Sequence, residues 1–316
     1  MDFDKLKENL QAGDTSNGFR SSLESWKGII KKEPEFLSPG QIDELLSCMS
    51  EWVIMRSSSK LVQEVLRLAI QLFYSLNLHS EFTFPLNETQ KPTPSINLGF
   101  ITCILSLMNS ILKSENPQRY KRILLSSLEI SCQVAADKSI LNSYRRKGTL
   151  KLILTYFKSL VKANEVSSRD LVRLICVMIA KLSYCSAKNR DYITRKSGIS
   201  ILCSLVKLEG GLTDDLKVLN EAIGALGSMA GTKDQQLTVW VQGGIDAILE
   251  LSQNSQLLRA SSYALWRACI DNQEIQGVLY TSSFHRKAIS LLGVQIEVHT
   301  QTFLIGILRR IASNCK

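Results

Sequence analysis

The chain has 316 residues, of which 45% are hydrophobic and 21% are charged, and it carries 38 Lys and Arg against 29 Asp and Glu, a net charge of +9. This length exceeds the size at which one compact core usually keeps growing, so several domains or an elongated repeat are expected. Gly and Pro are sparse, which favours helices over a turn-rich all-β fold. The excess of positive charge favours acidic partners: nucleic acid, an anionic membrane surface or an acidic peptide.

The sequence also bears on the compartment of the protein. The best apolar run, LGFITCILSLM, has about half of the roughly 20 apolar residues that a bilayer span needs. The opening residues, MDFDKLKENLQ, lack the apolar core of a secretory leader. The eight cysteines are spread along the chain without a CxxC pair, which predicts reduced thiols packed in the core. We therefore expect a location in the cytoplasm or the nucleus.

The N-terminal third contains two stretches with apolar residues three and four positions apart. IDELLSCMSEWVIM and KLVQEVLRLAIQLFYSLNL are predicted to be amphipathic helices. We assign residues 1–82 to degenerate helical repeats that cap the rest of the chain. Residues 83–97 hold three of the six prolines and are predicted to be a surface loop or a disordered segment. Residues 98–316 are predicted to continue from the N-terminal helices as one repeat region.

A repeat is visible in the second half of the chain. Four apolar segments, KGTLKLILTYF, SGISILCSLVKL, GGIDAILELS and SSFHRKAISLL, each begin with a small residue and continue with helical periodicity. Each follows a helix that ends in a small residue 13 to 15 positions earlier. The anchors are 50, 46 and 39 residues apart, close to the forty-odd residues of helical solenoid repeats. These anchors are Gly148, Gly198, Gly244 and Ser283.

One segment carries a specific resemblance. AIGALGSMAGTKDQQLTVWVQGGIDAILEL is similar to the pattern A-L-x-N-L-A, about fourteen residues, G-x-I-x-x-L of armadillo repeats. The resemblance covers roughly residues 100 to 316 and implies an all-α, right-handed superhelical solenoid. It also implies a protein-protein interaction scaffold, without naming the biological process.

No pattern of catalytic or metal-binding residues is present in the sequence. The three histidines are isolated, and HExxH, GxSxG, GxxxxGK and zinc-type cysteine pairs are missing. We expect no enzyme activity, no metal site and no cofactor.

The resemblance also implies a binding surface, because the third helix of each armadillo unit lines a concave groove. The position that usually reaches a bound peptide is held here by Gln133, Lys181, Ser228, Arg267 and Arg310. Tyr263 lies one helical turn before Arg267 and is predicted to face the groove, with Leu265 and Ala268 in the core and Trp266 undecided. The predicted partner-binding residues are Lys181, Ser228, Tyr263, Arg267 and Arg310.

The charge of these residues predicts the partner. Lys and Arg on one line favour an acidic or phosphorylated protein segment, since guanidinium groups pair with carboxylate and phosphate through two parallel hydrogen bonds. Solvated helix faces are the alternative explanation for the same charges.

A second basic feature supports other functions. Two short segments form a predicted basic rim if their ends meet, which would suit nucleic acid or anionic lipid. A structural subunit that assembles through its end faces is a third alternative. The rim residues are Arg119, Lys121, Arg122, Arg145, Arg146 and Lys147.

Overall fold

In the computed structural model of the protein, the described residues are 98–114, 117–134 and 138–314, together with scattered helical positions before residue 98. The predicted loop 83–97 and most of the predicted cap 1–82 lie outside these residues. Described positions of the two expected N-terminal helices, such as Leu45, Met49, Val65 and Leu68, are helical and buried. These apolar positions are buried, and the other positions of the two predicted helices lie mostly outside the described residues.

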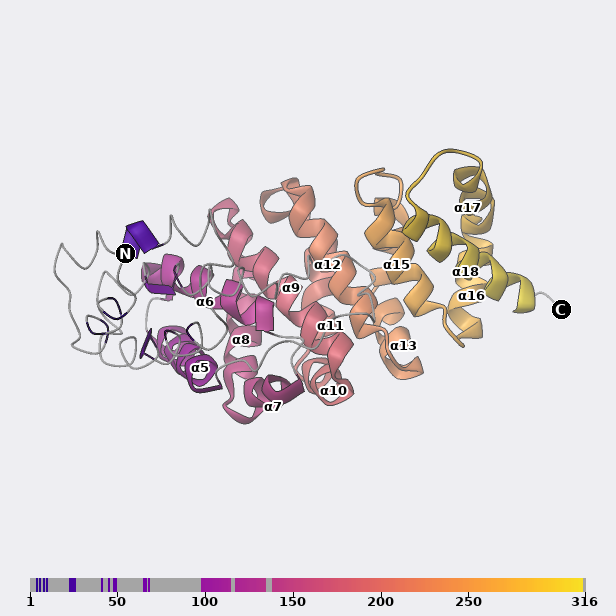
Figure 1. Ribbon diagram of the computed structural model, residues 1–316. Helices are drawn as coiled ribbons and strands as arrows, with labels where there is room; N and C mark the ends of the chain where they lie inside the picture. The colour runs from indigo at the N-terminus through magenta and orange to yellow at the C-terminus, as the bar shows by residue number, and fades with distance from the viewer. Residues whose placement is uncertain are drawn as a thin grey trace. The chain divides into compact units, whose positions relative to one another are not determined.

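Every regular element in the described ranges is a helix, as the all-α prediction requires (Figure 1). The first elements are α5 (Leu98–Lys113), η2 (Pro117–Tyr120), α6 (Lys121–Val134), α7 (Lys138–Arg146), α8 (Thr149–Ala163), η3 (Val166–Ser168) and α9 (Arg169–Cys185). They are followed by α10 (Ala187–Arg195), α11 (Gly198–Val206), η4 (Gly211–Asp214), α12 (Leu216–Met229), α13 (Lys233–Val241) and α14 (Gly244–Leu251). The last are α15 (Leu258–Ala268), α16 (Gln273–Thr281), α17 (Phe284–Leu292) and α18 (Val298–Asn314).

The contacts divide the chain into two units. The first comprises Met1–Glu81 and Glu88–Ile153, and the second comprises Phe82–Asn87 and Leu154–Lys316. The division falls inside α8, whereas the sequence predicted one continuous region from residue 98 onward. In the first unit, α5 packs against α6 and α7. The repeated helices from α10 to α18 all lie in the second unit.

Each repeat has three helices, and the first of them is the most regular in its length and in the way it begins. α10, α13 and α16 each span nine residues. Their N-caps are Ser186, Thr232 and Asn272, and each cap side chain accepts a hydrogen bond from the main-chain N–H three residues ahead. These side chains accept hydrogen bonds from main-chain N–H groups of the first helical turn, which have no acceptor within the helix. The sequence therefore defines where each repeat begins.

A left-handed residue turns the chain from the first helix into the second. Ser197, Gly243 and Ser283 have φ angles of 63°, 71° and 59°. Each lies eleven residues after the N-cap of its repeat, from 186 to 197, from 232 to 243 and from 272 to 283. Gly148, with φ of 73°, holds the same place between α7 and α8.

This geometry corrects the register of the sequence alignment by one residue. Gly198 and Gly244 are the first residues of α11 and α14, and the turn residues before them are Ser197 and Gly243. The sequence alignment was anchored on glycines. The turn instead requires a residue in the left-handed conformation, which serine also adopts here.

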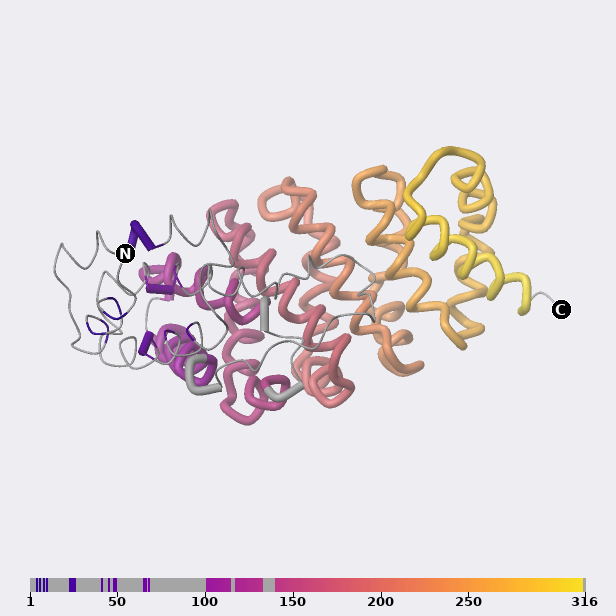
Figure 2. The backbone as a smooth tube through the Cα atoms, in the orientation of Figure 1, coloured from indigo at the N-terminus to yellow at the C-terminus, as the bar shows by residue number. Residues whose placement is uncertain are grey.

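The third helices of the second unit stack in sequence order. α12 packs against α9 and α15, and α15 packs against α18 (Figure 2). Glycine allows close approach at two of these contacts. A Cβ on Gly227 would lie 2.6 Å from Cε1 of Tyr263, and a Cβ on Gly306 would lie 2.7 Å from Cδ1 of Trp266. The stack therefore depends on small residues facing large aromatic ones.

The remaining sequence expectations concern membranes and thiols. Within the described residues, none of the helices combines the length and apolar character that a membrane crossing demands. Seven of the eight cysteines are described, and all seven are free thiols. Six are buried and Cys185 is half-buried, so the prediction of core thiols is confirmed for those six.

The packing of the third predicted repeat leads to a stability prediction. Leu226 and Ile245 are 1% and 0% exposed, as the repeat pattern predicted. Changing either residue to Ala should lower the free energy of unfolding by about 2 to 5 kcal/mol, because the core loses apolar contact and keeps part of the cavity. Urea unfolding followed by circular dichroism measures the change. Exposed Val241→Ala is the matched control, and a similar loss there would contradict the assignment.

Candidate functional site

A cavity of about 840 Å³ lies among α13, α15, α16 and α18. Amide, indole and charged side chains line it, together with the main chain at Gly306. Three lining residues are basic and two are acidic, so the charge of the lining is mixed with a small positive excess. The lining residues are Lys233, Trp266, Asp271, Gln273, Glu274, Gln276, Gly306, Arg309, Arg310, Ser313 and Asn314.

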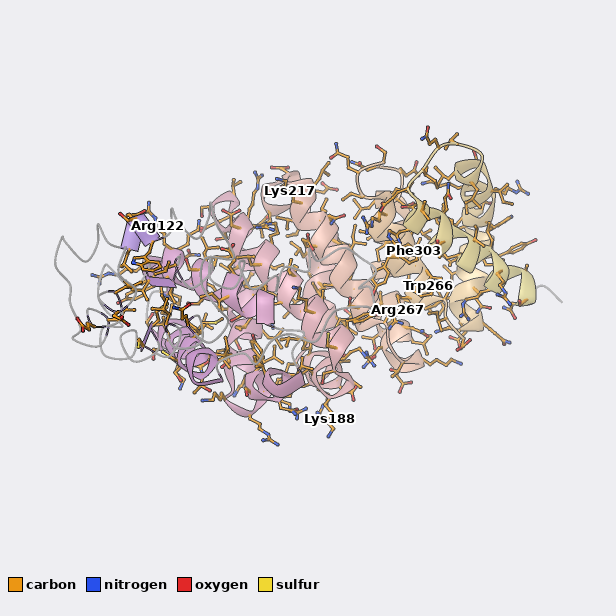
Figure 3. All side chains as sticks on the ribbon, viewed as in Figure 1. Arg122, Lys188, Lys217, Trp266, Arg267 and Phe303 are labelled. Carbon is orange, nitrogen blue, oxygen red and sulfur yellow. The ribbon has the colours of Figure 1, made fainter. Side chains whose placement is uncertain are left out.

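Trp266, the one aromatic residue among those that line this cavity, belongs to an aromatic cluster. The ring centroids of Trp266 and Phe303 are 5.4 Å apart, and those of Tyr263 and Phe303 are 5.5 Å apart in an edge-on arrangement. Figure 3 shows Trp266, Arg267 and Phe303 gathered where α15 meets α18. Trp266, which the sequence left undecided, thus packs against the neighbouring helix while part of its indole lines the cavity.

Two predicted groove residues are buried between helices. Tyr263 is 1% exposed and Ser228 is 0% exposed, and their hydroxyl oxygens lie 3.4 Å apart. The prediction that Tyr263 faces an open groove is therefore corrected. Its ring fills the space that Gly227 leaves between α12 and α15, which removes it from the surface. Leu265 and Ala268 are buried as predicted.

Lys181 is also buried, contrary to its predicted place on the groove surface. Only 3% of the residue is exposed. It interacts electrostatically with Glu221, a largely buried carboxyl group on α12. The charge of Lys181 thus interacts with a buried acid of the protein itself.

Arg267 and Arg310 do reach the surface, and each contacts the end of the preceding third helix. Nε of Arg267 donates to the carbonyl oxygen of Gly227 over 3.5 Å. Nη1 of Arg310 lies 3.0 Å from Oδ1 of Asp271, just beyond the end of α15. Cations near a helix C-terminus are favoured by its exposed carbonyls, so both arginines also stabilise the stack. Partner binding by these two residues stays a prediction.

Solved structures provide the comparison for this architecture. A designed armadillo repeat protein superposes with a TM-score of 0.63 at 13% identity, over 84% of this chain and 99% of the other. The beta-catenin structure from a study of a phosphorylation switch in cadherin binding gives a TM-score of 0.63 at 11% identity, over 99% of this chain and 53% of that chain. A designed armadillo repeat protein in complex with the peptide (KR)4 gives 0.58 at 14% identity, over 83% of this chain and 99% of that one.

The chain has an armadillo-like helical repeat fold. No family model matches the sequence, and no curated protein matches it either. The likeness is therefore one of structure, carried by the stack of three-helix repeats.

The armadillo-like repeats place a further set of polar residues at the ends of third helices, and the sequence analysis missed these residues. Arg190, Gln236 and Gln276 each lie four residues after the N-cap of their repeat, on α10, α13 and α16. Each donates to main-chain carbonyls at the end of a third helix. The acceptors are Ser183 O at 3.1 Å, Arg267 O at 3.1 Å, Ile270 O at 3.0 Å and Cys269 O at 2.9 Å. Their common distance from the cap is a signal that the sequence carried.

The predicted basic rim is divided in the structure. Arg119 in η2 and Arg122 in the first turn of α6 are exposed, and so are Arg146 at the end of α7 and Lys147 just after it. Figure 3 places Arg122 at one edge of the first unit, and Figure 1 shows α7 at the opposite edge. The two segments, which also include half-buried Lys121 and Arg145, do not form one continuous rim in this view.

Across the described ranges of the chain, His, Cys, Asp and Glu side chains form no group of three or more that could hold a metal ion.

The carboxyl group beside Lys181 gives a pH prediction. Burial raises the pKa of Glu221 to about 7, against the opposing influence of Arg173, Asn220 and Lys181. Its Oε2 atom is buried and has no hydrogen-bond partner in the structure. The folded state therefore binds a proton at the Glu221 carboxyl group more tightly than the unfolded state does. The stability that this bound proton contributes is lost as the pH rises from about 4.5 to about 7.

Replacing Glu221 with Gln should remove this dependence. At pH 8 the variant should be more stable than the unmodified protein by roughly 2 kcal/mol, because it no longer buries an ionised carboxylate. Below about pH 5 the two proteins should differ little. Urea unfolding at pH 5, 6, 7 and 8 measures the effect, with exposed Glu209→Gln as the control. Parallel stability curves for Glu221→Gln and the unmodified protein would contradict the assignment.

Proposed function

We propose that the protein is a non-catalytic scaffold that binds an acidic or phosphorylated peptide segment along the third helices of its C-terminal repeats. The cavity of about 840 Å³ is the observation that carries the proposal. It offers an indole face, amide groups and charged groups together. This combination suits a peptide, since amides bond a main chain while aromatic and charged groups select side chains.

The charges around the cavity favour an acidic segment. Lys233, Arg309 and Arg310 line it, and Arg267 follows Trp266 in the sequence of α15. Asp271 and Glu274 offset part of this charge by pairing with Arg310 and Lys233. Such a surface pair contributes little to stability, so a partner carboxylate can compete for the guanidinium group.

The structural neighbours support peptide binding as a class of function. A designed armadillo repeat protein is seen in complex with a basic peptide, (KR)4, and the beta-catenin study concerns an interaction with cadherin that phosphorylation controls. In this chain the cavity lining has a small excess of basic residues, so we assign the opposite sign of charge to the partner. The proposed location is the cytoplasm or nucleus, where the free thiols would stay reduced.

The proposal is tested by reversing two charges in the groove. A library of random twelve-residue peptides is selected on the unmodified protein, and the enriched peptides should be rich in Asp and Glu. The double change Arg267→Glu and Arg310→Glu should then weaken their binding more than tenfold, because two attractive contacts become repulsive. Fluorescence polarisation gives the dissociation constants.

Two matched controls belong to this test. The pair Arg145→Glu and Arg146→Glu changes the net charge equally but lies in the first unit, and it should alter the association rate while leaving the dissociation rate nearly constant. Circular dichroism should show that both double variants are folded. Equal peptide affinity in the groove variant and the unmodified protein would contradict the proposed function.

A second candidate function is a structural subunit that assembles through the C-terminal repeat. Val298 and Ile305, seven residues apart on one face of α18, are 71% and 55% exposed, and Ile289 on α17 is 60% exposed. Exposed apolar residues gathered on one element favour contact with another protein surface. In this candidate function, the partner that covers the exposed apolar residues is a second copy of the chain.

Analytical ultracentrifugation decides this candidate. The mass of the unmodified protein should rise with concentration, and Val298→Glu with Ile305→Glu should hold it at the monomer. Val241→Glu, at a 78% exposed position of α13, is the matched control and should assemble like the unmodified protein. A constant monomer mass for the unmodified protein would eliminate the candidate.

A further inference from the structure

Two guanidinium groups from different helices converge on the last turn of α12. Arg190, on α10, donates from Nη1 to the carbonyl oxygen of Ser183 over 3.1 Å and from Nε to Oε1 of Gln235 over 3.0 Å. Arg267, on α15, donates from Nε to the carbonyl oxygen of Gly227 over 3.5 Å. Both side chains are half-buried. Neutral groups thus fix the positions of two cations beside the groove.

A glycine makes room for one of these cations. Gly231 directly follows the C-cap of α12, and a Cβ there would lie 2.3 Å from Cζ of Arg190. Gly227 lies in the last turn of α12 and Gly231 just beyond its C-cap, so Arg267 and Arg190 border the same end of α12. Any larger residue at position 231 would displace the guanidinium group of Arg190.

The pair has no carboxylate partner of its own. Among the described residues, neither arginine has a carboxylate oxygen within 4 Å. Asp191 is the nearby acid, but it is exposed and its Oδ1 accepts a hydrogen bond from Nε2 of Gln235 over 2.8 Å. Burial and the charge of Arg267 lower the pKa of Arg190, while Asp191 and Tyr263 oppose that shift. Two like charges are thus held near each other in a partly desolvated place, which favours binding of an anion.

We propose that Arg190 and Arg267 form a phosphate subsite of the groove, and that its occupant is a phosphorylated Ser or Thr side chain of the bound segment. A guanidinium group has five N–H donors. In the described structure Arg190 uses two of its nitrogens and Arg267 uses one, which leaves donors on both groups for an oxyanion. The choice of a peptide phosphate rests on the proposed function, whereas the anion site itself rests on the two arginines.

Charge balance selects phosphate over carboxylate. A phosphate monoester carries about −1.5 to −2 charges at pH 7, which matches two guanidinium groups, whereas a carboxylate carries one. Three acceptor oxygens also allow one phosphate to bond both arginines, and paired contacts of this kind are the strong form of the interaction. Arg310 differs in this respect, because Asp271 already lies 3.0 Å from it.

Inorganic phosphate is the first probe, and the full-length protein is the sample. The arginine Nε–Hε signals are followed by NMR during titration with phosphate at pH 7.5 and constant ionic strength. Signals of Arg190 and Arg267 should shift together and saturate with one dissociation constant. Acetate at the same ionic strength should bind at least fivefold more weakly. Equal affinity for acetate would overturn the choice of phosphate.

Variants separate charge from geometry. Arg190→Lys and Arg267→Lys keep the charge but lose the planar fork, and each should weaken phosphate binding at least fivefold. Gly231→Ala leaves every charge in place and should have a similar effect, because it moves only the tip of Arg190. Arg195→Lys, at an exposed position on the same helix, is the matched control and should bind phosphate like the unmodified protein. Unchanged phosphate binding in all three site variants would overturn the subsite.

The second probe links the subsite to the peptide. One acidic peptide selected on the unmodified protein is synthesised with Ser or phosphoserine at each position in turn. At one position phosphoserine should improve binding at least tenfold, and Gly231→Ala should abolish that gain. If acidic peptides bind but no phosphoserine improves them, the subsite assignment fails and the proposed function stands. If phosphate binds at the two arginines but no peptide binds, the proposed function and the peptide occupant fail.

Discussion

Close packing between consecutive third helices is the contact on which the rest of the C-terminal unit depends. Gly227 and Gly306 bring main chain against the aromatic rings of Tyr263 and Trp266, with no space for a Cβ atom. Burial of these rings supplies apolar area that short repeats cannot bury alone. The same packing decides which residues remain for binding, because a side chain that fills the gap between two helices is lost from the surface.

The stack leaves a line of carbonyl groups at the ends of the third helices. The last four carbonyls of a helix have no partner within it. Here the first helix of a repeat supplies side chains at one recurring position, Arg190, Gln236 and Gln276, that donate to such carbonyls. The surface along these helix ends is therefore polar even where its charge varies. In the proposed function, the charged residues that the fold does not neutralise set the preference for a partner.

Neutralisation differs among the basic residues that the sequence placed on one line. Lys181 is buried near the carboxyl group of Glu221, and Arg310 pairs with Asp271. Arg267 bonds a main-chain carbonyl, which leaves its charge uncompensated by a carboxylate within the described structure. The positive charge that no carboxylate compensates thus lies on α15 and on α10, near the end of α12. For that reason Arg190, which the sequence analysis did not identify, belongs with Arg267.

The sequence by itself determined the helical class, the repeat and much of the core. Apolar periodicity predicted Ile245 and Leu226 in the core, and cap residues such as Thr232 mark the repeat starts, because these features depend on neighbours within one turn. Only the tertiary structure decided that Tyr263 is buried and that Arg267 stays half-exposed, although both lie on the same helical face. The helix periodicity fixes the direction of a side chain, but the adjoining helix determines whether that direction leads to solvent or to a gap beside a glycine.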